Sequence, residues 1–283
     1  MLTIPAPAKL NLTLEVLARR PDGYHEIRSV IQTVSLCDRL AFRASEQVEI
    51  KSDSAEWSAE KSLVSRAVRI VRDKTGISKG IAIDVENRIP LISGLGGDSS
   101  ATAATLRGLN QVWELNLTQE RLLELAAQLG SDVPFFLHGG TALAEGRGEI
   151  LTPLPPLPHH LAVLVIPDVP RLPGKTAKLY ASLNTSYFTD GQITQRVVEE
   201  LKDGREPSTL FNTFENVVFA AGSEMKVYRD HLKKMGAPHV HLAGSGPALF
   251  TLLKDKTEAE ELYTRCRNQK METYLVETYL PTG

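Results

Sequence analysis

Cysteines and long apolar runs are scarce in this sequence of 283 residues, and each scarcity excludes a class of protein. The two cysteines, Cys37 and Cys266, leave one bridge between them open but are too few for a disulfide framework, which is typical of a reducing compartment. No stretch reaches the roughly 18 apolar residues that a membrane helix needs, and no basic segment followed by an apolar run opens the chain. We therefore predict a cytoplasmic protein with no membrane partner.

A large excess of either charge is also missing. Lysine plus arginine number 32 against 34 aspartate plus glutamate, so the net charge of -2 gives no basic field for nucleic acid or anionic lipid. Hydrophobic residues make up 42% and charged residues 23%, which matches an ordinary globular enzyme. We expect a small-molecule ligand in a local site, no nucleic-acid partner, and a monomer or weak homodimer.

The apolar periodicity predicts both strands and helices in each half of the chain. In the first half it predicts strands over residues 2–16, 30–36, 39–43, 48–50 and 81–85, helices over 62–75, 99–113 and 119–129, and a hairpin over 141–151. Residues 153–158 contain four prolines, which cannot continue regular structure, so we place a domain boundary after Pro153. The second half repeats the mixture, with strands over 161–166, 240–242, 248–253 and 274–278 and helices over 192–202, 215–218, 225–234 and 258–269.

A glycine-rich segment at residues 89–101 is the strongest local signal for function. It reads Ile-Pro-Leu-Ile-Ser-Gly-Leu-Gly-Gly-Asp-Ser-Ser-Ala and leads into an alanine-rich helix. Glycines allow the backbone to approach an anion, and the unpaired amides at a helix start supply donors and positive potential. A glycine-rich turn capped by serine would look similar, but the paired serines and the helix favour a phosphate site.

The common nucleotide-binding motifs are absent. Neither Gly-x-x-x-x-Gly-Lys-Ser/Thr nor Gly-x-Gly-x-x-Gly occurs in the chain. Gly174-Lys175-Thr176 imitates the end of the first pattern, but Val169 replaces its first glycine and Pro173 lies inside the candidate loop. We predict that this triplet belongs to a surface loop.

Three separate segments resemble the superfamily of galactokinase, homoserine kinase, mevalonate kinase and phosphomevalonate kinase. They are residues 5–27, with Pro-Ala-Pro-Ala-Lys-Leu-Asn-Leu and Arg-Pro-Asp-Gly-Tyr-His-Glu-Ile, the loop at 89–101, and Leu-Ala-Gly-Ser-Gly-Pro-Ala-Leu-Phe at 242–250. The resemblance implies an α+β fold of two domains, residues 1–153 with a mixed sheet and helices and residues 154–283 as a ferredoxin-like sandwich. It also implies ATP and magnesium, with nucleotide contacts at Pro90, Gly94, Leu95, Gly96, Gly97, Ser99 and Ser100 and a magnesium ligand at Ser100.

Within this superfamily, several motifs resemble the kinases that act on a cytidine-diphosphate-linked methylerythritol. They are Pro-Ala-Lys-Leu-Asn at 7–11, Asp-Gly-Tyr-His at 22–25 and Gly-Ser-Asp-Val-Pro-Phe-Phe at 130–136, and Asn-x-x-Glu at 212–215 also agrees. The resemblance implies phosphorylation of the methylerythritol 2-hydroxyl in isoprenoid precursor synthesis. It also implies that Asn11, Tyr24 and His25 bind the substrate, the last two by recognising its pyrimidine.

The resemblance further implies two catalytic residues, Lys9 and Asp132. Asp132 would accept the proton of the substrate hydroxyl, and Lys9 would orient that hydroxyl and offset negative charge. Without the family, Asp132 is an ordinary helix-capping residue and Lys9 a surface charge on a strand. The Gly-Ser-Gly at 244–246 would add backbone donors near the phosphates, although a tight hairpin explains it equally well.

Three positions depart from the family pattern. Asp98 stands where glycine is more frequent, Thr102 where this group often has aspartate or asparagine, and Ser62 where we expect asparagine near the adenine. A carboxylate aimed at a triphosphate would weaken binding, because two unit charges about 4 Å apart interact by roughly 4 kcal/mol at an effective dielectric near 20. We predict that the Asp98 carboxylate points away from the nucleotide.

Other functions remain open at this stage. A homoserine or mevalonate type of kinase would act on a different small alcohol, and a decarboxylase of the same fold would release carbon dioxide. A sensor that has lost catalysis would keep the fold, but the presence of both Lys9 and Asp132 argues against it.

Overall fold

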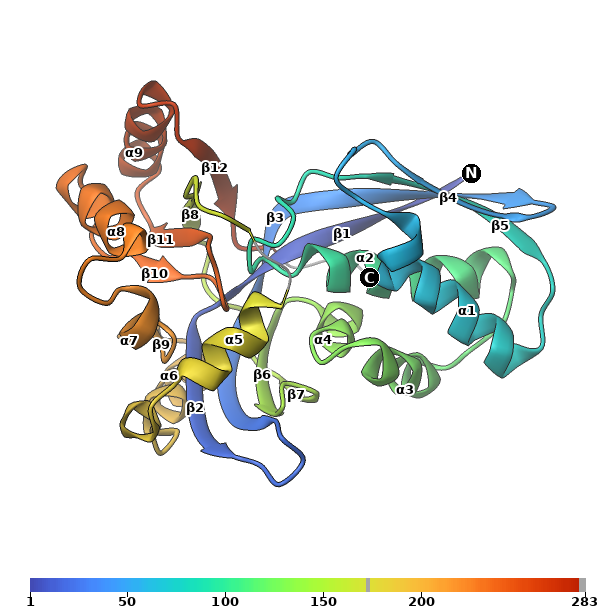
Figure 1. The fold of residues 1–283 in the computed structure, drawn as a ribbon, viewed down its shortest axis with the longest axis horizontal. Coiled ribbons are helices and arrows are strands. Elements are labelled where there is room, and N and C mark those ends of the chain that lie inside the picture. Colours follow the sequence, from blue (N-terminus) through green and yellow to red (C-terminus); the bar gives the residue numbers. More distant parts are fainter. Residues whose placement is uncertain (172–173, 280–283) are drawn as a thin grey trace. The chain divides into compact units, whose positions relative to one another are not determined.

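The computed structural model describes residues 1–171 and 174–279 of the chain (Figure 1). Two compact units interleave along the sequence. The first unit comprises Met1–Ala8, Leu36–Leu91 and Gly96–His138, and the second comprises Lys9–Ser35, Ile92–Leu95 and Gly139–Gly283. Because each unit gathers separate stretches of chain, the domain boundary after Pro153 stays a prediction.

The larger sheet has eight strands, ordered β4-β5-β3-β2-β9, with β1 and β6 also pairing with β3 and β7 pairing with β6. The long strand β3 contributes to both units. Its Leu40 pairs with Val85 of β5 in the first unit, and its Val30 pairs with Leu143 of β6 in the second. The strands are β1 (Leu2–Asn11), β2 (Thr13–Arg19), β3 (His25–Ser45), β4 (Val48–Ser52), β5 (Gly80–Glu86), β6 (Thr141–Gly146), β7 (Ile150–Pro153) and β9 (Phe211–Asn212).

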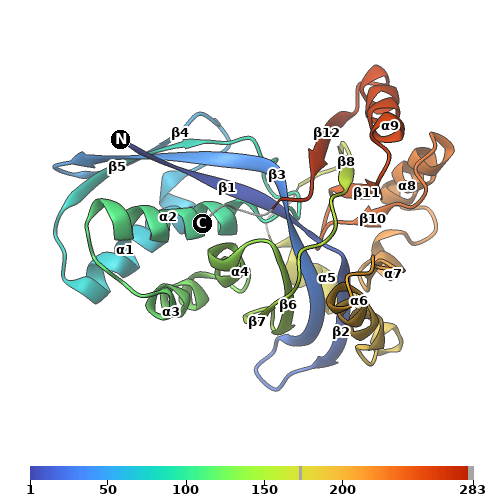
Figure 2. The same ribbon diagram turned by 180° about the vertical axis from the view of Figure 1, so that it is seen from behind.

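Four α-helices pack together in the first unit (Figure 2). They are α1 (Leu63–Thr75), α2 (Gly97–Val112), α3 (Gln119–Leu129) and α4 (Val133–His138), and the 3-10 turn η1 (Ala59–Lys61) precedes them. Small residues let α2 approach its neighbours: a Cβ on Gly108 would lie 2.4 Å from Cζ of Phe42. Helix α2 therefore packs closely against β3 at Gly108.

The second unit contains an antiparallel sheet with the order β10-β11-β8-β12. Its strands are β8 (Leu161–Ile166), β10 (His241–Leu242), β11 (Leu249–Leu253) and β12 (Glu272–Glu277). Its helices are α5 (Lys175–Ser182), α6 (Gln192–Lys202), α7 (Glu215–Val218), α8 (Glu224–Lys234) and α9 (Lys256–Asn268), with the 3-10 turn η2 (Thr185–Tyr187). A mixed sheet with helices and a separate antiparallel sheet with helices confirm the α+β class.

Both cysteines are free thiols. Cys37 lies on β3, and Cys266 lies on the buried side of α9. Burial raises the pKa of each thiol to about 11.

Within the described residues, no helix combines the length and apolar character that crossing a membrane requires.

A buried carboxylate interrupts the apolar pattern of β3 without breaking the strand. Asp38 is 1% exposed, and its Oδ1 accepts hydrogen bonds from the backbone N–H groups of Arg88 and Ile89, both at 2.7 Å. Burial raises its pKa to about 6, although these two N–H groups act in the opposite direction. Asp38 therefore fixes the chain just before the glycine-rich loop.

Asp38→Asn should become progressively more stable relative to the wild type as pH rises. The raised pKa means that the folded state holds the Asp38 proton up to about pH 6, whereas the unfolded chain releases it near its ordinary pKa of 3.8. The contribution of Asp38 to folding stability is therefore fully present below the pKa of 3.8 in the unfolded chain. It is lost as pH rises through the pKa of about 6 in the folded state. Between pH 5 and pH 7.5 the free energy of unfolding of the wild type should fall by about 1 to 2 kcal/mol relative to the amide.

Urea unfolding of both proteins across this pH range measures the difference. Asp73→Asn removes an exposed carboxylate from α1 and controls for the loss of one charge. A constant stability difference between wild type and Asp38→Asn at all pH values would show that Asp38 is ionised alike in both states.

Candidate active site

Lys9 and Asn11 lie on β1, at its carboxyl end, and both are 5% exposed. The ammonium of Lys9 donates to Oδ1 of Asn11 at 2.7 Å, and Nδ2 of Asn11 donates to Oγ of Ser29 at 2.8 Å. This chain of bonds fixes the amide orientation and aligns the ammonium. Lys9 is thus a buried, oriented cation rather than the surface charge that its residue type alone suggests.

Two glycine-containing loops meet beside Lys9. The first glycine loop contains Gly94, and the second comprises residues 244–246. A Cβ on Gly94 would lie 2.2 Å from the Ala243 carbonyl oxygen and 2.8 Å from the Gly246 nitrogen, so only glycine fits there. A Cβ on Gly244 would lie 3.0 Å from Nζ of Lys9 and 3.3 Å from Oδ1 of Asn11. The loop at 244–246 is therefore both the connection from β10 to β11 and a close neighbour of the first glycine loop and of Lys9.

Two side chains of the Asn-x-x-Glu stretch hold this second loop in place. Asn212 donates from Nδ2 to the carbonyl oxygens of Leu242 and Gly244, at 2.9 and 2.8 Å. Oε1 of Glu215 accepts from the N–H of Leu242 at 2.9 Å and lies 3.1 Å from Nδ1 of His241. The primary amide of asparagine supplies both of these donors from a single nitrogen.

The first glycine loop continues into α2 in the first unit. Gly96 is the N-cap residue, with φ 79°, and no side chain in the described part of the chain caps the helix. The amides of its first turn have no carbonyl partner within the helix and can bind an anion. Ser99 lies in this turn, half-buried, while Oγ of Ser100 is buried and has no hydrogen-bond partner among the described residues.

The remaining residues predicted to contact the nucleotide support the loop rather than extend from it. Leu95 is fully buried, and its carbonyl oxygen accepts from the Lys9 N–H at 2.9 Å. Pro90 is half-buried near the start of the loop at 89–101. Gly97 begins α2, where a Cβ would lie 3.1 Å from Cγ2 of Ile89. Nucleotide contact by any of these residues stays a prediction.

The three residues that depart from the family pattern each form a hydrogen bond within the protein. The Asp98 carboxylate accepts a hydrogen bond from the N–H of Leu63, the first residue of α1, and partial burial raises its pKa despite this bond and the nearby Arg66. This contact gives the carboxylate a partner on α1, and its direction relative to the nucleotide stays a prediction. The hydroxyl of Thr102 donates to the Asp98 carbonyl oxygen at 2.6 Å. Ser62 caps α1, and its Oγ accepts from the Ser65 N–H at 3.2 Å, so its contact with adenine stays a prediction.

Asp98→Gly should leave the KM for ATP unchanged or lower it, because it removes a negative charge near the loop. It should also lower the free energy of unfolding by about 1 kcal/mol, because the N-terminus of α1 loses an acceptor. Steady-state kinetics and thermal unfolding measure the two effects. Asp98→Asn keeps an acceptor and should retain more of the stability. A large loss of turnover in both variants would identify Asp98 as a metal ligand.

Asp132 belongs to the first unit and directly precedes α4. It is half-buried. The far end of this short helix is fixed, because the Leu137 carbonyl oxygen accepts from Nη2 of Arg107 at 2.7 Å and from Nε2 of Gln119 at 3.1 Å. Lys9 belongs to the second unit, and the meeting of Lys9 and Asp132 at one hydroxyl stays a prediction.

His25 lies in an aromatic cluster that the sequence did not reveal. Its ring stacks on Tyr180, with centroids 4.7 Å apart, and Phe188 meets it edge-on at 5.9 Å. Nε2 of His25 is buried and has no hydrogen-bond partner in the described part of the chain, and burial lowers the pKa of the ring. A neutral imidazole with one unused nitrogen beside flat rings can recognise the polar edge of a planar ligand.

Tyr24, the residue before His25, is 54% exposed. The guanidinium of Arg147 lies over its ring, 4.7 Å from the centroid. One face of the tyrosine is thus covered by a cation. The sequence predicted Tyr24 and His25 as a pair, but it gave no signal for Arg147, Tyr180 or Phe188.

The prediction of a surface loop at Gly174-Lys175-Thr176 was wrong. Gly174 is the N-cap residue of α5, with φ 74°, and Lys175 begins the helix. Oγ1 of Thr176 lies 2.8 Å from Oγ of Ser245, which joins α5 to the loop at 244–246. The apparent nucleotide motif is therefore a helix start that contacts a glycine loop.

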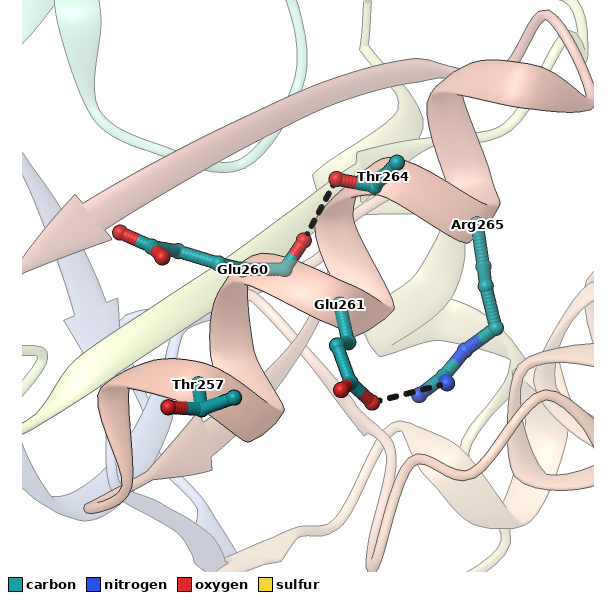
Figure 3. A pocket seen from close by; sticks show the side chains of 5 residues that line it. All are labelled: Thr257, Glu260, Glu261, Thr264 and Arg265. Atoms are coloured by element: carbon teal, nitrogen blue, oxygen red, sulfur yellow. Dashed lines mark hydrogen bonds and ion pairs between the residues drawn. The ribbon is translucent and has the colours of Figure 1, made fainter.

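An open depression on α9 has no chemical link to these residues. Figure 3 shows that it is lined by side chains of this helix alone: Thr257, Glu260, Glu261, Thr264 and Arg265. Arg265 pairs with Glu261 at 3.4 Å, and the Thr264 hydroxyl donates to the Glu260 carbonyl oxygen at 2.7 Å. These are contacts between successive turns of a helix.

Comparison with known proteins identifies the family. The sequence model of the "GHMP kinases N terminal domain" matches residues 62–140, and that of "GHMP kinases C terminal" matches residues 197–272. The chain belongs to the GHMP kinase family, whose kinases use ATP and include phosphotransferases that act on an alcohol group. The family resemblance of the sequence is thereby confirmed.

The most similar proteins include several kinases of one name. The 4-diphosphocytidyl-2-C-methyl-D-erythritol kinase of Dehalococcoides mccartyi is 50% identical over 282 residues and covers 99% of both chains. The kinase of the same name from Bacillus subtilis is 36% identical over 276 residues, covering 96% of this chain and 94% of its own. A crystal structure of 4-(cytidine 5'-diphospho)-2C-methyl-D-erythritol kinase has a TM-score of 0.84 at 32% identity and covers 99% of this chain and 100% of that one.

A more distant structure has the same fold. Homoserine kinase from Cytophaga hutchinsonii has a TM-score of 0.72 at 17% identity and covers 98% of this chain and 94% of its own. At this identity the likeness concerns the fold alone.

Proposed function

We propose that this chain transfers the γ-phosphoryl group of ATP to the 2-hydroxyl of 4-diphosphocytidyl-2-C-methyl-D-erythritol. The observation that carries the proposal is the 50% identity, over nearly the whole chain, to a kinase named for this substrate. The local geometry agrees with that reaction. A buried, oriented ammonium lies against two glycine loops, and the same unit contains a partly buried imidazole among aromatic rings.

Lys9 and Asp132 perform the chemical step in this proposal. The substrate 2-oxygen forms a bond to the γ-phosphorus, the bond from that phosphorus to the β–γ bridging oxygen breaks, and ADP leaves. The hydroxyl proton passes to the Asp132 carboxylate, and the Lys9 ammonium orients the hydroxyl and offsets the charge. Because Lys9 is 5% exposed, its charge is weakly screened and therefore effective.

The phosphates of the nucleotide would contact the first-turn amides of α2, and the loops that meet at Gly94 and Gly244 carry further backbone N–H groups. These groups fit phosphate oxygens, because backbone N–H groups and a helix N-terminus both favour negative charge. Ser100 would hold the magnesium ion, since its buried Oγ has no other hydrogen-bond partner among the described residues. When bound, magnesium neutralises charge on the phosphates.

The cytidine end of the substrate would meet Tyr24 and His25. Flat rings bind a pyrimidine by stacking, and Nε2 of His25, which has no hydrogen-bond partner among the residues that the structure describes, would bond to the polar edge of the base. Asn11 would contact the substrate from the same strand face as Lys9. Location in the cytoplasm and a monomer or weak homodimer remain part of this proposal.

Incubation of the purified protein with γ-labelled ATP and single acceptors tests the reaction. We expect label on the cytidine-diphosphate methylerythritol and none on homoserine or mevalonate. Free cytidine nucleotides should inhibit by competing with the acceptor. Label on homoserine or mevalonate without such competition would replace this function by another kinase of the family. Release of carbon dioxide from a mevalonate diphosphate would identify a decarboxylase.

A further inference from the structure

We propose that Arg147 is a positioning residue, which fixes the Tyr24 ring as a one-sided stacking platform for the pyrimidine of the substrate. Its guanidinium carbon lies 4.7 Å from the ring centroid, on one face of a tyrosine that is 54% exposed. The inference rests on the proposed function, because it concerns how the base of that substrate is held. Nothing in the sequence motifs assigns a role to Arg147.

The backbone of Tyr24 is fixed before the ring is considered. Its N–H donates to Oδ1 of Asp22 at 3.1 Å, and its carbonyl oxygen accepts from the Arg20 N–H at 2.9 Å. These bonds close the turn between β2 and β3. The freedom that remains belongs to the tyrosine side chain, and the guanidinium restricts it by covering one face.

Arg147 is itself held in place, as a positioning group must be. It lies in the turn between β6 and β7, where its N–H donates to Oε2 of Glu149 at 2.6 Å and its Nε donates to Oε1 at 3.3 Å. The pairing of Gly146 with Ile27 brings this turn beside the start of β3. Two hairpins that are distant in the sequence therefore bring cation and ring together.

Such a contact acts on substrate binding rather than on the chemical step. An exposed tyrosine that must be ordered when a base stacks on it loses rotamer freedom, and ordering it beforehand avoids that loss. Removing the guanidinium should raise the KM for the cytidine substrate about three- to tenfold, as expected for an exposed cation–π contact plus one ordered side chain. The turnover number at saturation and the KM for ATP should not change.

Arg147→Met tests this, because methionine keeps aliphatic bulk and removes the planar cation. Arg147→Lys should recover part of the affinity, since it keeps the charge without the flat group. Arg229→Met is the matched control: Arg229 lies over Phe219 at the same distance, 4.7 Å, and it pairs with Asp230, which is not one of the proposed site residues. It should leave every kinetic constant unchanged. Thermal unfolding checks that all variants are folded.

A double-mutant cycle with Tyr24→Leu separates action through the ring from direct contact. If Arg147 acts through Tyr24, adding Arg147→Met to Tyr24→Leu should cause no further loss of affinity. Independent, multiplicative losses would overturn the proposal. Binding of cytidine should weaken as much as binding of CDP in Arg147→Met. A loss confined to CDP would show that Arg147 contacts phosphate instead.

Binding of cytidine to the wild type distinguishes a failure of the Arg147 inference from a failure of the proposed function. If the wild type binds cytidine and Arg147→Met binds it equally well, this inference fails and the proposed function stands. If the wild type phosphorylates no cytidine substrate and binds neither cytidine nor CDP, the proposed function fails and the inference fails with it.

Discussion

Asp132→Asn should lower the turnover number by a factor of about 10² to 10⁴, the usual contribution of a positioned general base. The amide keeps the size of the side chain but cannot accept the hydroxyl proton. Binding of a non-hydrolysable ATP analogue and of the cytidine substrate should change by less than a few fold, because the loops and the aromatic cluster are untouched. Asp132→Ala should give the same kinetic result. Single-turnover labelling and calorimetric titration measure the two effects.

Asp73→Asn again serves as the control, because it removes an exposed carboxylate from the same unit. Its turnover should equal that of the wild type. If Asp132→Asn also turned over normally, Asp132 would have no part in proton transfer, and the mechanism would need another base. If Asp132→Asn lost ligand binding and turnover together, its role would be structural.

Gly94→Ala should nearly abolish activity and lower stability by more than the backbone term alone. The residue has φ 88°, and a left-handed conformation costs alanine about 1 to 2 kcal/mol. In addition, its Cβ would lie 2.2 Å from the Ala243 carbonyl oxygen, so the two loops must separate. A displacement of about 1 Å in groups that position a substrate costs about 10²-fold in rate. We therefore expect at least that loss in kcat/KM for ATP.

Gly222→Ala isolates the backbone term. Gly222 has φ 82° in the same unit, and apart from its two chain neighbours no described residue would have a heavy atom within 4 Å of a Cβ there. This variant should lose only about 1 to 2 kcal/mol of stability and keep its activity. Equal behaviour of the two variants would contradict the close contact between the loops at Gly94 and Gly246.

Most elements of the fold followed from apolar periodicity, and the errors have local causes. The helix over 119–129 and the strand over 161–166 have the predicted bounds, because their apolar faces are regular. The pattern over 30–43 was divided at Asp38, whereas the structure has one strand. A buried carboxylate imitates a turn in the sequence, since the two backbone N–H groups that satisfy it come from 50 and 51 residues away.

The candidate site was predictable only where a motif carried it. The glycine loop has a recognisable composition, and the family resemblance supplied Lys9 and Asp132. Arg147 and Tyr180 have no such signal, because each meets its partner through tertiary pairing of strands and helices. Helix α5 was missed for a related reason: the sequence around Gly174 matched a loop motif, and its contact with Ser245 depends on the folded chain.

The two thiols have a practical consequence for following the loops in solution. With pKa values raised to about 11, Cys37 and Cys266 remain almost wholly uncharged at neutral pH, and only the thiolate attacks alkylating reagents. A fluorophore could therefore be attached to a new cysteine at an exposed position such as Val227 without replacing the natural ones. The label would therefore react with the introduced cysteine and hardly at all with Cys37 and Cys266.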